Sequence, residues 1–167
     1  MIVRVLKDLY KKPGDFALRD EFGNMMLKCA FVGKGYYIYN KRGIQIAQLA
    51  FGKNEASMAV AQNVPSYPGA VRIVKLGRDN FEFETNVIEK GDDQYTKNVV
   101  GRAVAKFSVW GPVSKYSYDI FDGSEKVGEV IPYPADDGVF QIRTYSETNI
   151  LYVFMITLAL EWLNAAN

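Results

Sequence analysis

Side chains able to do nucleophilic or acid–base chemistry are scarce in this chain. Histidine is absent, so the commonest general acid–base group and metal ligand is missing. No Ser-His-Asp or Cys-His site can be assembled. The single cysteine, Cys29, lies in the apolar stretch 25–32, and we expect a buried structural thiol, because reactivity requires exposure and a lowered pKa. One cysteine also excludes a disulfide framework within the chain.

Two pairs of carboxylates are the remaining candidates for catalysis. Asp92 and Asp93 form one pair, and Asp136 and Asp137 the other. Paired carboxylates transfer protons when they lie about 5–10 Å apart across a cleft. Each pair here is adjacent in sequence and next to glycine, which favours a surface turn. An enzyme that uses these surface carboxylates is kept as an alternative, but we expect no catalysis, no metal and no cofactor.

Basic residues in turns could bind an anionic surface. The weak candidates for lipid binding are Lys11, Lys12, Lys41, Arg42 and Lys53. Each such residue contributes about 1 kcal/mol near an anionic membrane, so only a cluster would matter. A solvated turn is the simpler interpretation, and the sequence does not show whether these turns converge. The net charge of +1 and pI of about 7.7 leave no electrostatic footprint for nucleic acid.

Apolar alternation and turn residues predict short strands over about 2–145, with no helical segments between them that would indicate a parallel sheet. Asp20 to Gly23 and Asn40 to Gly43 share a turn pattern, and Asp122-Gly123 is a looser copy. Asp, Asn and Gly suit such turns because they tolerate left-handed backbone and form local hydrogen bonds. We therefore interpret these repeats as hairpin turns and not as ion-binding loops.

The stretch 150–163 is apolar on nearly every side, which predicts a helix buried all round. A membrane span needs about 20 apolar residues, so this shorter run favours a core helix over residues 148–164. A protein inserted into the membrane through residues 150–163 is the alternative. The structural residues expected in this helix are Ile150, Leu151, Val153, Phe154, Met155, Ile156, Leu158, Leu160 and Trp162.

These elements together predict one mainly β domain over residues 1–167. We expect a closed antiparallel barrel of about twelve strands, since closure removes exposed strand edges, with the hydrophobic C-terminal helix threaded through it. Arg4 and Lys7 interrupt the N-terminus before a signal sequence could form, so we expect a cytoplasmic protein without a transmembrane span.

The segment Tyr37-Ile-Tyr-Asn-Lys-Arg-Gly43-Ile-Gln-Ile-Ala47 resembles the tubby C-terminal-like superfamily. So do the segment 116–123, the following Val127-Gly-Glu-Val130, and the apolar C-terminal helix. The closest branch is the LURP-one-related proteins with their small bacterial relatives of the YxjI type, which are related to phospholipid scramblases. The resemblance implies a twelve-stranded barrel around a central helix.

Tubby proteins bind phosphoinositides through basic side chains. The resemblance therefore implies a non-catalytic binding or scaffold protein, peripheral to the membrane. Its expected partner is anionic phospholipid or an unknown protein. Scramblases carry an acidic segment and several cysteines that have no counterpart here, so lipid scrambling is not implied.

Overall fold

The computed structural model describes residues 1–10, 13–60, 68–90, 97–104, 107–145 and 150–165. Thirteen strands run through these described residues: β1 (Ile2–Leu6), β2 (Phe16–Arg19), β3 (Met25–Val32), β4 (Gly35–Tyr39), β5 (Gln45–Gly52), β6 (Glu55–Val60), β7 (Pro68–Gly77), β8 (Asn80–Lys90), β9 (Lys97–Val104), β10 (Phe107–Trp110), β11 (Tyr118–Asp122), β12 (Glu125–Pro132) and β13 (Val139–Thr144). The helices are two short 3-10 turns, η1 (Lys7–Tyr10) and η2 (Val113–Lys115), and one α-helix, α1 (Ile150–Ala165).

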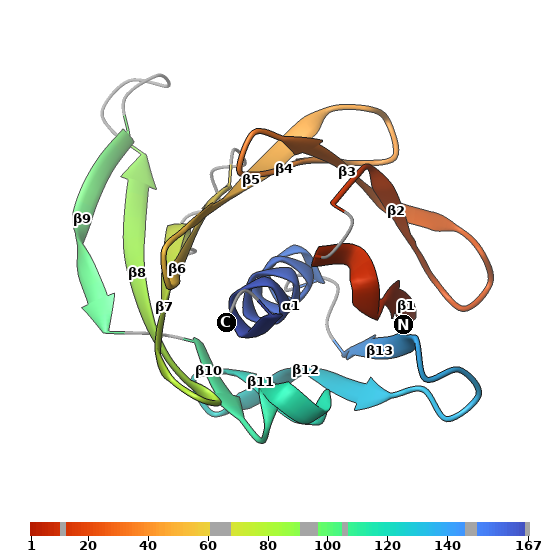
Figure 1. The fold of residues 1–167 in the computed structure, drawn as a ribbon. Coiled ribbons are helices and arrows are strands. Elements are labelled where there is room, and N and C mark those ends of the chain that lie inside the picture. The colour runs from red at the N-terminus through yellow and green to blue at the C-terminus, as the bar shows by residue number, and fades with distance from the viewer. Residues whose placement is uncertain (11–12, 61–67, 91–96, 105–106, 146–149, 166–167) are drawn as a thin grey trace.

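The strands form two antiparallel sheets that curve around α1. One sheet has eight strands in the order β2-β3-β4-β5-β6-β7-β8-β9, and the other has five in the order β1-β13-β12-β11-β10. Figure 1 looks along α1 and shows the eight-stranded sheet over one side of the helix and the five-stranded sheet under the other. The mainly β character and the C-terminal helix therefore agree with the prediction.

The prediction of a closed barrel was wrong, because no sheet closes on itself among the described residues. On one side, the two sheets share only the isolated bridge between Val3 and Asp20, since β2 ends at Arg19 and Asp20 begins a turn. On the other side, β9 pairs with β8 from Glu84 onward, while β10 pairs with β11. The start of β8 and the strand β10 therefore border a seam between the sheets.

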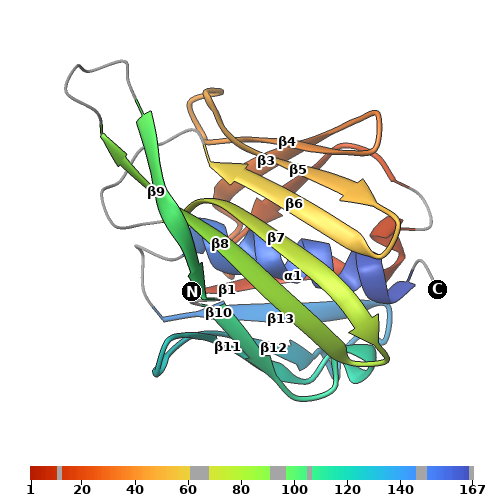
Figure 2. The ribbon, with the colours of Figure 1, turned by 90° about the vertical axis from the view of Figure 1, so that its left-hand side faces the viewer.

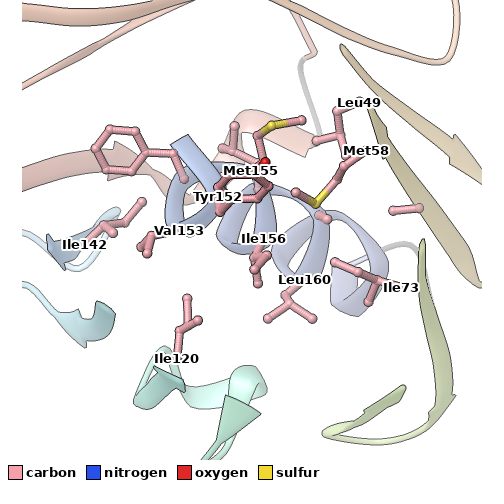
Figure 3. Packing of buried hydrophobic residues seen from close by; sticks show 14 of the residues in the cluster. Leu49, Met58, Ile73, Ile120, Ile142, Tyr152, Val153, Met155, Ile156 and Leu160 are labelled. Carbon is pink, nitrogen blue, oxygen red and sulfur yellow. The ribbon is translucent and has the colours of Figure 1, made fainter. Parts of the chain in front are cut away.

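The core lies between α1 and the inner faces of both sheets. The buried stretch of α1 runs from Tyr152 to Glu161, and Leu163 is also buried. Figure 3 shows Met155, Ile156 and Leu160 among residues of both sheets, such as Met58 and Ile142. A helix apolar on all sides finds apolar partners in every direction here, which explains why its sequence has no polar stripe.

The repeated turn pattern forms hairpin turns, as predicted. Asn40 Oδ1 accepts hydrogen bonds from the backbone N–H groups of Arg42 and Ile44, both at 3.0 Å. Asp20 Oδ1 accepts equivalent bonds in the β2–β3 turn. Gly43 has a φ of 83°, a left-handed conformation that glycine adopts without a steric penalty.

Candidate functional site

The predicted basic turns lie at opposite ends of the eight-stranded sheet. Lys41 and Arg42 precede β5, whereas Lys53 follows it. At about 3.3 Å per residue, the length of β5 separates these two turns by about 25 Å. All three side chains are exposed. Lys11 and Lys12 lie outside the described residues. The structure therefore does not bring these sequence candidates into one patch.

A different set of basic residues meets at the Lys53 end. In an antiparallel sheet every second turn falls at the same end, which groups the turns 33–34, 53–54 and 78–79. They carry Lys34, Lys53 and Arg78, and Lys75 stands at the end of β7. Figure 2 shows the β7–β8 turn beside the C-terminal end of α1. We call this region the basic end.

An open hollow of about 550 Å³ lies at the basic end. We call it the basic hollow; its lining residues are Asn54, Lys75, Leu76, Gly77, Arg78, Ser114 and Asn164. These residues come from the β5–β6 turn, the β7–β8 hairpin, η2 and the last turn of α1. The wall thus combines two cations with amide and hydroxyl groups, which suits an anionic oxygen ligand.

Hydrogen bonds hold the walls of the basic hollow together. Asp79, between β7 and β8, accepts bonds from the backbone N–H of Ser114 at 2.7 Å and from its hydroxyl at 2.8 Å. Lys75 Nζ donates to the carbonyl oxygen of Leu163 at 3.4 Å. The Asp79 carboxylate is therefore engaged with η2, and Lys75 anchors the C-terminal end of α1.

The cations of the basic end have no carboxylate partner among the described residues. Among the described residues, neither Lys53 nor Arg78 has an acidic group within ion-pair distance. Arg72, by contrast, pairs with Glu55 at 2.6 Å and with Glu84 at 3.4 Å on the sheet surface. Lys53 and Arg78 are thus available to an external anion, whereas Arg72 is engaged.

Apart from the basic hollow, a polar group lies inside the core. It was not identified as a candidate site from the sequence. Glu161 is buried on α1, and its Oε1 accepts a hydrogen bond from the Tyr118 hydroxyl at 2.9 Å. Beside it is a cavity of about 20 Å³, enough for about one water molecule. Its lining residues are Val5, Leu6, Lys7, Leu9, Tyr36, Phe140, Leu158, Glu161 and Trp162. The signal was present in the sequence as a lone carboxylate near the end of an apolar helix.

Burial sets the ionisation of this interior group. It raises the pKa of Glu161 to about 8, against a smaller lowering by the Tyr118 hydrogen bond and the Lys7 charge. The Tyr36 hydroxyl is also buried and has no hydrogen-bond partner among the described residues. The cavity beside Glu161 is too small for a substrate molecule.

The remaining candidates for chemistry are inert or exposed. Cys29 is fully buried on β3, and burial raises the pKa of its thiol to about 12, which keeps it unreactive. Asp136 and Asp137 are exposed, and Asp136 Oδ1 accepts a bond from the Gly138 N–H at 2.9 Å, closing a surface turn. Asp92 and Asp93 lie outside the described residues.

In the described part of the chain, acidic and cysteine side chains do not gather in threes or more so as to hold a metal ion. None of the helices in that part is both long and apolar enough to cross a membrane.

The chain is similar in fold to a solved plant protein structure. The X-ray structure of the Arabidopsis thaliana protein AT5G01750 aligns with a TM-score of 0.56 over 99% of this chain and 92% of that chain. The sequences are 13% identical, so the likeness shows the fold alone. No family model and no curated protein matches the chain.

Proposed function

We propose that this protein is a non-catalytic binding module of the tubby-like, LURP-one-related type. Its ligand is an anionic, phosphate-bearing group such as a phospholipid headgroup, and it acts in the cytoplasm at the membrane surface. The observation that carries the proposal is the basic hollow lined by Lys75 and Arg78, with Lys53 in the β5–β6 turn at the same end of the sheet.

The chemistry at the basic hollow supports an anionic ligand. Arg78 lines the hollow and presents a planar set of donors suited to phosphate, and Lys53, which precedes the lining residue Asn54 in the next turn, adds a mobile point charge. The one carboxylate carried by these turns, that of Asp79, is engaged by Ser114 and does not compete. Each cation contributes about 1 kcal/mol at an anionic surface, so removing two lowers affinity about thirtyfold.

Lys75 has a structural explanation that Lys53 and Arg78 do not share. A cation at the C-terminus of a helix stabilises the helix dipole, and Lys75 makes such a contact with the Leu163 carbonyl. A Lys75 variant would therefore confuse folding with binding. The decisive variants are at the two exposed turn residues.

The test is co-sedimentation with vesicles that contain phosphatidylcholine and anionic lipid, at low and high salt. We expect wild type to bind in a salt-sensitive way and Lys53→Gln/Arg78→Gln to lose that binding. Lys41→Gln/Arg42→Gln is the matched control, because it removes two charges from the opposite end. Equal loss in both variants, or no binding by wild type at low salt, would overturn the proposal.

A further inference from the structure

The basic hollow continues into an apolar hollow along the seam between the sheets. This second hollow, of about 440 Å³, shares the side chain of Leu76 with the first. We call it the seam hollow; its lining residues are Leu76, Phe81, Glu82, Phe83, Phe107, Ser108, Val109 and Trp110. It lies where β8 and β10 form no ladder with each other.

Two large apolar side chains are exposed here next to the cations. Trp110 is 67% exposed and Leu76 is 58% exposed. Leu76 stands at the end of a hairpin strand with Lys75 before it and Arg78 two residues after it. Exposing such side chains to water is unfavourable unless a partner covers them.

From this arrangement we infer that Leu76 and Trp110 enter the interfacial layer of an anionic bilayer while Lys53 and Arg78 contact its headgroups. The inference rests on the proposed function and adds the partner and the orientation. Tryptophan favours the membrane interface because its ring is apolar and its N–H is polar. Here that N–H already donates to Ser108 Oγ at 3.3 Å, so the ring can leave water without stranding a donor.

Charge distinguishes the exposed apolar side chains at this end from Phe22 at the opposite end. Phe22, 81% exposed, also stands in a turn, but Asp20 and Glu21 precede it directly. Anionic headgroups would repel that turn. Glu82 is the one carboxylate among the residues lining the seam hollow, and it is outnumbered by the cations of the basic end.

The test uses tryptophan emission with anionic vesicles, some of which carry brominated acyl chains that quench nearby indoles. We expect the wild-type emission to shift to the blue and to be quenched. Trp110→Phe should show neither change, because the remaining Trp162 is stacked on Phe51 with ring centres 4.3 Å apart. Unchanged Trp110 emission in vesicle-bound protein would overturn the inference.

Partition measurements give a second readout. Leu76→Ser/Trp110→Ser should weaken vesicle binding by at least about tenfold, since burial of even one large apolar side chain is worth that much. Phe22→Ser, which removes an exposed ring at the opposite end, should leave binding unchanged. Equal effects of the two changes would contradict the orientation. Thermal melting of each variant checks that the fold is retained.

A soluble anion separates this inference from the proposed function. Inositol trisphosphate carries phosphate groups without acyl chains. One outcome is that inositol trisphosphate binds wild type but not the Lys53→Gln/Arg78→Gln variant, while vesicles leave the Trp110 emission unchanged. The anion site is then supported and the inference of bilayer insertion is wrong. If neither inositol trisphosphate nor vesicles bind, the proposed function fails as well.

Discussion

Tyr118 and Glu161 form a hydrogen bond inside the core, with the phenol donating to the carboxyl oxygen at 2.9 Å. The bond joins β11 to the last part of α1. Burial, and then the Glu161 charge, raise the pKa of Tyr118 well above its usual value. With the pKa of Glu161 itself raised to about 8, the carboxyl is mostly protonated at neutral pH. The helix therefore enters the core without a buried charge.

Stability should fall as pH rises through the Glu161 titration. The carboxyl has a pKa of about 8 when folded against an ordinary value of 4.5, so between these values the folded state binds more protons. The free energy of unfolding then falls by up to about 1.4 kcal/mol per pH unit. Glu161→Gln should remove this slope, as measured by urea unfolding from about pH 5 to pH 8. An unchanged slope would show that Glu161 is ionised in the fold.

Removing the Tyr36 hydroxyl should not destabilise the protein. This buried group has no hydrogen-bond partner in the described structure, and an unpaired buried hydroxyl costs free energy. Tyr36→Phe should therefore leave the free energy of unfolding equal or raise it by about 1 kcal/mol. Tyr118→Phe is the matched control and should lower it by about 1 kcal/mol, because Glu161 loses its donor. Similar losses in both would indicate a water molecule bound to Tyr36.

Local patterns predicted the elements well, because strands and turns follow from neighbouring residues. Asn40 and Gly43 set a turn through their own hydrogen bonds and backbone angles. The uninterrupted apolar run around Phe154 likewise predicted a helix with no solvent face. The helix begins at Ile150 and ends at Ala165, close to the predicted limits.

Whether the two sheets close into a barrel was not predictable in the same way. Closure depends on backbone hydrogen bonds between the edge strands of the sheets, and the alternation of apolar and polar residues along a strand does not encode these bonds. Val3 meets Asp20 in a single bridge, and Trp110 lies on a strand that pairs with β11 alone among the described residues. Convergence of Lys53 and Arg78 could have been predicted, since both sit in turns at the same end of a meandering sheet.

A charge introduced in the middle of α1 should prevent folding. Phe154 and Met155 are fully buried, and a carboxylate there would have no partner. We expect Phe154→Asp and Met155→Asp to be insoluble or to lack a cooperative thermal transition. Ile44→Asp is the control, because Ile44 is 57% exposed. A soluble Met155→Asp protein with an unchanged melting temperature would contradict the enclosed helix.

Gly128 and Val153 should be energetically coupled, because β12 approaches α1 closely at this pair. A Cβ added to Gly128 would lie 2.6 Å from Val153 Cγ1 and 3.1 Å from its Cγ2. Gly128→Ala should therefore cost about 1–3 kcal/mol through overpacking. Val153→Ala should also destabilise, by opening a cavity at a fully buried position.

The double variant Gly128→Ala/Val153→Ala should lose less stability than the sum of the two single losses. Val153→Ala removes the methyl groups that the new Cβ at position 128 would press against, and that Cβ fills part of the space they leave. We expect a coupling of at least about 0.5 kcal/mol in urea unfolding. Gly14→Ala is the control for the glycine substitution alone, since its added Cβ would meet no described atom within 4 Å. Strict additivity would mean that β12 shifts away from α1 instead of pressing on Val153.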